Sequence, residues 1–166
     1  MAKTAFKGQE VNTSGELPSI GSGAPPFTLV GADLSEKTLA DYQGKKIVLT
    51  INPSYDTGVC QATARRFHQE LGARGDTVVL MVSADLPFAQ KRFCEAEGIV
   101  NIFPLSSFRS SFAQDYGVEL VDGPLRGLTA RAVVVLDDAH QVVYSELTKD
   151  IVEEPNFEAA AAALSA

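Results

Sequence analysis

Apolar residues along this chain gather in short runs separated by turns, and the longest runs are rich in β-branched residues. Three of them, Ile47–Ile51, Thr77–Ser83 and Thr129–Leu136, are almost continuously apolar. Such runs are typical of strands that are buried on both faces of a sheet. Shorter runs predict the remaining strands, which are Thr4–Phe6 and Glu10–Asn12 as an N-terminal hairpin, Phe27–Val30, Ile99–Phe103, and Gln141–Leu147 in a hairpin with the strand before it.

A helical pattern follows the strand at Ile47–Ile51. The loop Asn52-Pro53-Ser54 ends that strand, and Thr57 is a suitable helix N-cap. Residues at helical spacing then share one stripe: Cys60, Ala64, Phe67 and Leu71. The sequence therefore places Cys60 in the first turn of a helix, on its inward side, just beyond the end of a strand.

Four further helices are predicted from stop and start signals. Three of them are Ser35–Tyr42, ended by Gly44, Ser107–Tyr116, ended by Gly117, and Asn156–Leu164. The other is capped by Asp85, has Pro87 in its first turn and ends at Gly98. Alternating strands and helices followed by a hairpin and a helix predict an α/β fold. We expect residues 1–166 to form one domain with a mixed central sheet and helices on both faces.

The overall composition narrows the possible partners. The chain has 166 residues, 45% of them hydrophobic and 21% charged, with a formal net charge of −7. An acidic chain is a poor match for nucleic acid, which binds surfaces with excess Lys and Arg. No apolar run reaches the roughly 18 residues of a membrane span, and Met1–Gly8 has no apolar core of a secretory signal. We therefore expect a cytoplasmic protein that contacts neither membrane nor nucleic acid.

The motifs of cofactor and metal sites are missing from the sequence. There is no phosphate-binding loop, no nucleophile elbow and no dinucleotide fingerprint. Cys60 and Cys94 are too far apart for a Cys-x-x-Cys motif or a zinc knuckle. His68 and His140 stand apart from any Cys/His/Asp cluster and are expected on the surface. We expect neither a cofactor nor a metal.

The position of Cys60 has two interpretations. Unpaired N–H groups and the positive end of the helix dipole favour the thiolate, which is the reactive form of cysteine. Most buried cysteines, however, are inert small hydrophobic residues. Position alone leaves both interpretations open.

The surrounding residues favour the reactive interpretation. Pro53, Thr57 and Cys60 form a Pro-x-x-x-Thr-x-x-Cys motif, and the string from Pro53 to Cys60, PSYDTGVC, resembles the thiol peroxidase branch of the peroxiredoxin family. The segments Ser83–Gln90, Arg92–Cys94 and Ala130–Val135 resemble the same branch, so the likeness runs over nearly the whole chain. One departure is Tyr55, where that branch more often carries an aliphatic residue.

This resemblance implies a thioredoxin-like fold and a two-step reaction. Cys60 would attack hydrogen peroxide or an organic hydroperoxide and become a sulfenic acid. Cys94 would resolve it as an intramolecular disulfide, which thioredoxin would reduce by exchange. The residues alone leave open that Cys94 is a core residue of its helix. The family also implies a homodimer packed near the active site.

Three residues around Cys60 receive roles from the same resemblance. Arg131 lies on the strand face shared by Val133 and Val135, and it matches the active-site arginine of the family. From the residues alone it could equally pair with a carboxylate or lie at the wet end of the strand. Thr57 either caps the helix or orients the peroxide, or does both. Pro53 lacks an N–H and would shield the thiolate from water.

Two other functions remain open on the sequence. One is a general disulfide oxidoreductase, against which the missing Cys-x-x-Cys motif counts. The other is a redox-sensing or chaperone-like binding protein in which Cys60 oxidation switches an interface. Turnover distinguishes them, because a sensor reacts once whereas an enzyme consumes peroxide continuously.

Overall fold

The computed structural model describes residues 1–71, 74–99 and 102–165. Within these residues, seven strands form one sheet and two form a separate hairpin. The sheet strands are β3 (Thr28–Gly31), β4 (Glu36–Thr38), β5 (Lys46–Ile51), β6 (Thr77–Ser83), β7 (Phe103–Ser106), β8 (Ala132–Leu136) and β9 (Val142–Leu147). The hairpin consists of β1 (Lys3–Phe6) and β2 (Gln9–Asn12), as predicted.

The sheet is mixed, with the order β4-β3-β7-β6-β5-β8-β9. β5 and β6 are parallel, as are β6 and β7. β8 is antiparallel to β5 and to β9. The apolar runs that the sequence predicts as doubly buried strands are three adjacent interior strands, β6, β5 and β8, and their burial explains their continuous apolar character. The third of them begins at Ala132 rather than at Thr129 as predicted.

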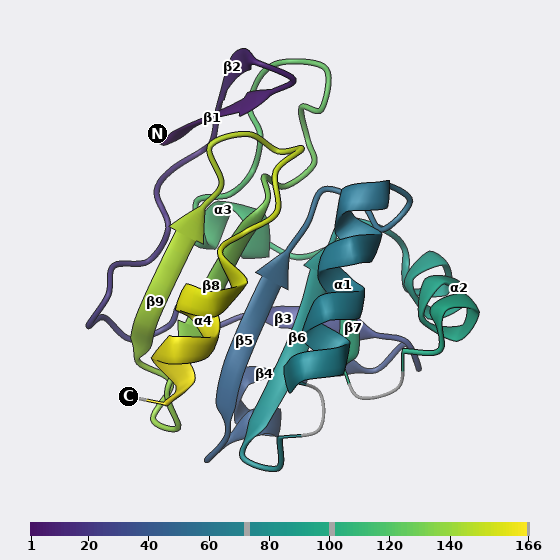
Figure 1. The fold of residues 1–166 in the computed structure, drawn as a ribbon, viewed down its shortest axis with the longest axis vertical. Helices are drawn as coiled ribbons and strands as arrows, with labels where there is room; N and C mark the ends of the chain where they lie inside the picture. The colour runs from purple at the N-terminus through teal and green to yellow at the C-terminus, as the bar shows by residue number, and fades with distance from the viewer. Residues whose placement is uncertain (72–73, 100–101, 166) are drawn as a thin grey trace.

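Helices cover both faces of this sheet. They are α1 (Gly58–Leu71), α2 (Pro87–Glu97), α3 (Phe112–Asp115) and α4 (Phe157–Leu164), with a 3₁₀ turn η1 at Leu39–Tyr42. α1 and α4 lie in front of the sheet in Figure 1, where Val48 and Val133 belong to their apolar cluster. On the other face, Leu49 shares a cluster with Phe112 of α3. The predicted mixed sheet with helices on both faces and an N-terminal hairpin is confirmed.

The helix predicted at Ser35–Tyr42 is wrong in its first half. Glu36–Thr38 pairs with β3 as an antiparallel strand, and only Leu39–Tyr42 is helical. The reason is a capping box, in which Thr38 and Asp41 satisfy each other's backbone N–H groups. This cap starts the helical turn at Leu39 and leaves the preceding residues extended.

The helix predicted at Ser107–Tyr116 is also too long, because only Phe112–Asp115 is helical. Serine hydroxyls compete for the backbone in the preceding segment: Ser106 Oγ accepts the Phe108 N–H, and Ser110 Oγ accepts the Phe112 N–H. The strand predicted at Ile99–Phe103 is shifted, since β7 begins at Phe103, and residues 100–101 of that prediction lie outside the described ranges.

Candidate active site

Cys60 lies where the sequence predicts it, in the first turn of α1 beyond the end of β5. The residue has no exposed surface. Thr57, immediately before α1, accepts a hydrogen bond from the Cys60 N–H at 3.4 Å and donates one to the Ser54 carbonyl at 3.1 Å. Thr57 therefore caps the helix and ties its start to the loop that follows the strand. Pro53 of this loop is buried and Thr57 is exposed.

The Asp85 side chain fixes the loop between β5 and α1 by hydrogen bonds. Its carboxylate accepts hydrogen bonds from Ser54 Oγ and from the Tyr55 N–H, each at 2.8 Å, and from Ser83 Oγ at 2.9 Å. The prediction that Asp85 caps α2 is wrong, because the N-cap is Leu86 and no side chain bonds there. The carboxylate is committed to the loop before α1, so it links the ends of β5 and β6.

Arg131 is brought to the same end of β5 by strand register. Ile51 pairs with Ala132 across the antiparallel β5–β8 ladder, so one step further Asn52 lies opposite Arg131. Arg131 Nη1 donates to Asn52 Oδ1 at 2.8 Å, and Nε donates to the Ile151 carbonyl at 2.7 Å. The side chain is 2% exposed.

This environment decides between the interpretations that the sequence leaves open for Arg131. No carboxylate of the described residues forms an ion pair with it, and its burial excludes a position at a wet strand end. Val133 and Val135 of β8 belong to the apolar cluster that contains Cys60. Arg131 lies one residue before β8, and the alternation of that strand, continued by one residue, puts its side chain on the face of that cluster.

Tyr55 occupies the space between these groups and α2. It is 2% exposed and belongs to the same apolar cluster as both cysteines. Its ring stacks on Phe93 of α2 with the centroids 5.3 Å apart. The pKa of Tyr55 is raised well above its ordinary value, first by burial and then by the electrostatic effect of the neighbouring Cys60. The hydroxyl therefore keeps its proton at neutral pH.

Cys94 lies on α2 and is 8% exposed. Burial, and secondarily the charge of Glu95, raises the pKa of its thiol to about 11. It is therefore a neutral thiol at physiological pH in this conformation. Both cysteines are free thiols, and their membership of one apolar cluster places them on the same face of the sheet.

The two histidines differ from their prediction as surface residues, because both are half-buried. His140 lies with Nε2 3.1 Å from the Tyr42 carbonyl, and the Nδ1 atom of His68 is buried without a hydrogen-bond partner among the described residues. Among all the residues that the structure describes, no three His, Cys, Asp or Glu side chains form a group that could hold a metal.

No helix that the structure describes is long and apolar enough to cross a membrane.

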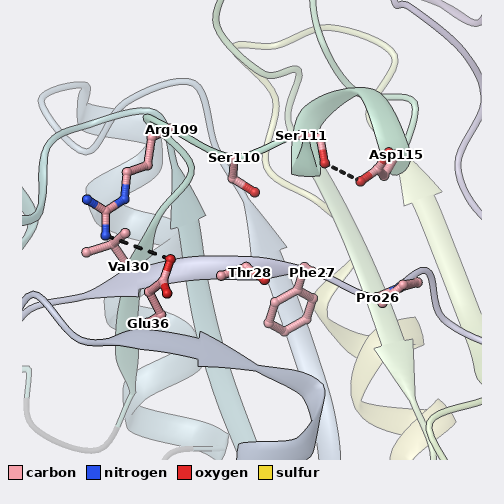
Figure 2. Close-up of a pocket in the computed structure, with 9 residues that line it drawn as sticks. All are labelled: Pro26, Phe27, Thr28, Val30, Glu36, Arg109, Ser110, Ser111 and Asp115. Carbon is pink, nitrogen blue, oxygen red and sulfur yellow. Dashed lines mark hydrogen bonds and ion pairs between the residues drawn. The ribbon is translucent and has the colours of Figure 1, made fainter.

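Two of the open pockets on the described surface are relevant to the location of the site. A groove of about 370 Å³ lies between the start of α1 and α2, with Asp56 and Gln61 on one side and Arg92 and Phe93 on the other. Figure 2 shows a different pocket, of about 480 Å³, where Phe27–Val30 faces the segment that leads into α3. None of the predicted site residues lines either pocket, but Asp56 and Phe93 of the first are neighbours in sequence of Thr57 and Cys94. The size of the second pocket gives no reason to move the site there.

Sequence reasoning missed three residues that assemble this site: Asn52, Tyr55 and Asp85. The sequence indicates only that Asn52 belongs to a strand-ending loop, whereas in the structure it is fully buried and accepts a hydrogen bond from Arg131. A polar residue directly after an apolar strand and before the Pro53 motif was the available signal. For Tyr55 the signal was its departure from the usual aliphatic residue. Nothing in the local sequence indicates that Asp85 bonds a distant loop rather than its own helix.

Comparison with known proteins gives a consistent result. The Redoxin family model matches residues 19–162. The chain is 52% identical to a thiol peroxidase of Mycobacterium tuberculosis over 166 residues, which is 100% of both chains. It is 49% identical to a thiol peroxidase of Corynebacterium glutamicum, covering 99% of this chain and 100% of that one. The crystal structure of a peroxiredoxin-like protein from Aquifex aeolicus matches with a TM-score of 0.92 at 36% identity, covering 98% of this chain and 96% of that one.

Proposed function

The chain belongs to the thiol peroxidase branch of the peroxiredoxins, and from this membership we propose that Cys60 is the residue that attacks the peroxide. The observation that carries the proposal is the assembly around Cys60. It lies at the N-terminus of α1, out of contact with water, on the same sheet face as a buried arginine and a second free cysteine. A helix N-terminus and a nearby cation both stabilise a thiolate.

In the first step, the Cys60 thiolate attacks the terminal oxygen of the hydroperoxide. The O–O bond breaks, Cys60 becomes a sulfenic acid, and the other oxygen leaves with a proton as water or an alcohol. The Arg131 guanidinium stabilises the thiolate and the peroxide oxygen by charge-assisted hydrogen bonds. The Thr57 hydroxyl orients the peroxide, a role that fits its exposure at the mouth of the site. Pro53 excludes water, which fits its burial.

In the second step, the Cys94 thiol attacks the sulfenic acid, a Cys60–Cys94 disulfide forms and water leaves. Peroxiredoxin thiol peroxidases use thioredoxin-type reductants, and we propose thioredoxin itself as the dithiol that reopens this disulfide. Hydrogen peroxide and organic hydroperoxides are the proposed substrates. The whole chain acts as one domain, and its proposed location is the cytoplasm.

A homodimer packed near the active site completes the proposal. Its support is the exposure of apolar side chains close to the start of α2. Leu86 is 51% exposed, Phe88 68% and Phe108 45%. Phe108 comes near the other two because Ser106 Oγ donates to the Asp85 carbonyl. Exposed apolar side chains of this size commonly mark an interface.

The test compares wild type with Cys60→Ser and Cys94→Ser. Peroxide consumption is followed with thioredoxin, thioredoxin reductase and NADPH. We expect no turnover in Cys60→Ser, because no other nucleophile replaces the thiolate. Cys94→Ser should reduce one equivalent of peroxide and stop as a sulfenic acid, detected by mass. Continued turnover in Cys60→Ser would refute the role of Cys60, and wild-type turnover in Cys94→Ser would refute the role of Cys94.

A further inference from the structure

A chain of buried polar side chains connects Arg131 to Tyr55. Asn52 Oδ1 accepts from Arg131 Nη1 at 2.8 Å, and Asn52 Nδ2 donates to the Tyr55 hydroxyl oxygen at 2.7 Å. Nδ2 also lies 3.2 Å from the hydroxyl and from the carbonyl of Thr50. The Tyr55 hydroxyl is thus the nearest acceptor of this amide group.

The direction of these bonds is fixed by donor and acceptor chemistry. A guanidinium has donors only, so an amide beside it must present its oxygen. Its NH₂ group then points away and needs an acceptor of its own. If the Asn52 amide turned over, its NH₂ group would face the Nη1 donor of Arg131. Arg131 and the Thr50 carbonyl therefore fix the orientation of the amide, and the Tyr55 hydroxyl, the nearest partner of Nδ2, holds the amide in place.

Water cannot replace the Tyr55 hydroxyl as a partner of the Asn52 amide, because the site is closed to solvent. Thr50 is 1% exposed, Asn52 0%, Tyr55 2% and Arg131 2%. In such a dry site each hydrogen bond is stronger and each unpaired group more costly than at the surface. Without the Tyr55 hydroxyl, Nδ2 of Asn52 keeps only the two longer contacts to Thr50, each at 3.2 Å. Tyr55 thus supplies the shortest hydrogen bond of this amide group.

We propose that Tyr55 is a positioning residue for the peroxidase reaction: its hydroxyl holds the Asn52 amide in place, and the amide holds the Arg131 guanidinium at the end of β5 where α1 begins. Asn52 is well suited to this task because its backbone is fixed as well. Its N–H donates to the Val82 carbonyl, and its carbonyl accepts from Thr129 Oγ1, both at 2.9 Å. The proposal rests on the function proposed above, in which Arg131 acts at Cys60.

The variant Tyr55→Phe separates this role from simple core packing. It keeps the ring that stacks on Phe93 and removes only the hydroxyl. The rate constant of peroxide attack on the reduced protein is measured by stopped flow across a pH series. We expect the rate to fall about 2-fold to 12-fold, the range that one net hydrogen bond supplies. The pH midpoint of the rate should rise, because a less well placed guanidinium stabilises the thiolate less.

Tyr116→Phe is the matched control. Tyr116 is a fully buried tyrosine whose hydroxyl donates to the Pro25 carbonyl at 2.9 Å, in the apolar cluster on the other face of the sheet. Its loss should lower the thermal midpoint without changing the rate or the pH midpoint. If Tyr55→Phe keeps the wild-type rate and pH midpoint, or changes them no more than Tyr116→Phe does, the proposal is wrong.

A double-mutant cycle with Arg131→Met tests whether Tyr55 acts through Arg131. Arg131→Met alone should slow the attack, and adding Tyr55→Phe should slow it no further. Independent, multiplied effects would overturn the proposal. A wild-type rate in Arg131→Met would remove Arg131 from the reaction and this role of Tyr55 with it. The nucleophile is tested separately by Cys60→Ser, so a failure of the positioning role is distinguishable from a failure of the proposed function.

Discussion

Raising the pH should lower the free energy of unfolding of the reduced protein, because the buried Cys94 thiol resists deprotonation. Burial raises the pKa of this thiol to about 11 from an ordinary value of 9.0. Between these two values the unfolded chain has released the proton and the folded chain still holds it. The folded state then binds more protons than the unfolded one, so the free energy of unfolding falls as the pH rises. This contribution is fully present below pH 9 and is lost as the pH approaches 11.

Its magnitude follows from the difference between the two pKa values. A difference of about two pH units corresponds to at most about 3 kcal/mol in total. Half of this should be lost by pH 10, which leaves about 1 kcal/mol after screening by water is taken into account.

The assay is urea unfolding of reduced wild type and Cys94→Ala at intervals from pH 8 to pH 10.5. Cys94→Ala removes the titrating thiol and keeps a good helix former in α2. All other titratable groups are the same in both proteins, so the difference between the two free energies of unfolding reports on Cys94. We expect the wild type to lose about 1 kcal/mol more than the variant by pH 10. A difference that stays constant across the series would refute the argument.

Three further predictions concern the rest of the site. Arg131→Met should slow peroxide attack and raise its pH midpoint, measured by stopped flow and by thiolate absorbance; an unchanged titration with an unchanged rate would remove Arg131 from the site. Residues 56–64 and 86–98 should exchange backbone hydrogens faster in the disulfide form than in the reduced form, while the central strands stay protected. Equal protection in both forms, with the disulfide confirmed by mass, would mean that the cysteines meet without local unfolding. Asp85→Ala removes the acceptor of a buried loop N–H and should lower stability by about 1–3 kcal/mol in thermal or urea unfolding. An unaltered stability would show that the loop before α1 does not depend on this carboxylate.

Much of the fold could be predicted because its central elements follow local patterns. Apolar runs locate β5, β6 and β8, and a stripe with Cys60 and Leu71 locates α1. The two helices that are shorter than predicted share one physical cause, which is competition between side chains and backbone for hydrogen bonds. Serines shortened α3, and the capping box of Thr38 delayed η1.

The site could be predicted only where a motif marks it. Pro53, Thr57 and Cys60 are close in sequence, so their pattern is readable. The partners of Arg131 depend on the register of β5 against β8, which no local pattern gives. The commitment of Asp85 to Ser54 and Tyr55 likewise depends on how the ends of β5 and β6 meet.

The two steps of the proposed reaction are linked by Tyr55. Its hydroxyl bonds the amide that holds Arg131, and its ring stacks on Phe93 in the helix of Cys94. We propose that α2 opens in the second step, because the buried thiol of Cys94 has a pKa of about 11 and is a poor nucleophile where it lies. Such an opening would take Phe93 away from the Tyr55 ring and release the residue that holds Asn52. On this proposal the arrangement that favours peroxide attack is dismantled as the disulfide forms, and it returns after the disulfide is reduced and α2 folds back. Peroxide attack and disulfide formation would then require two different conformations of the same buried cluster.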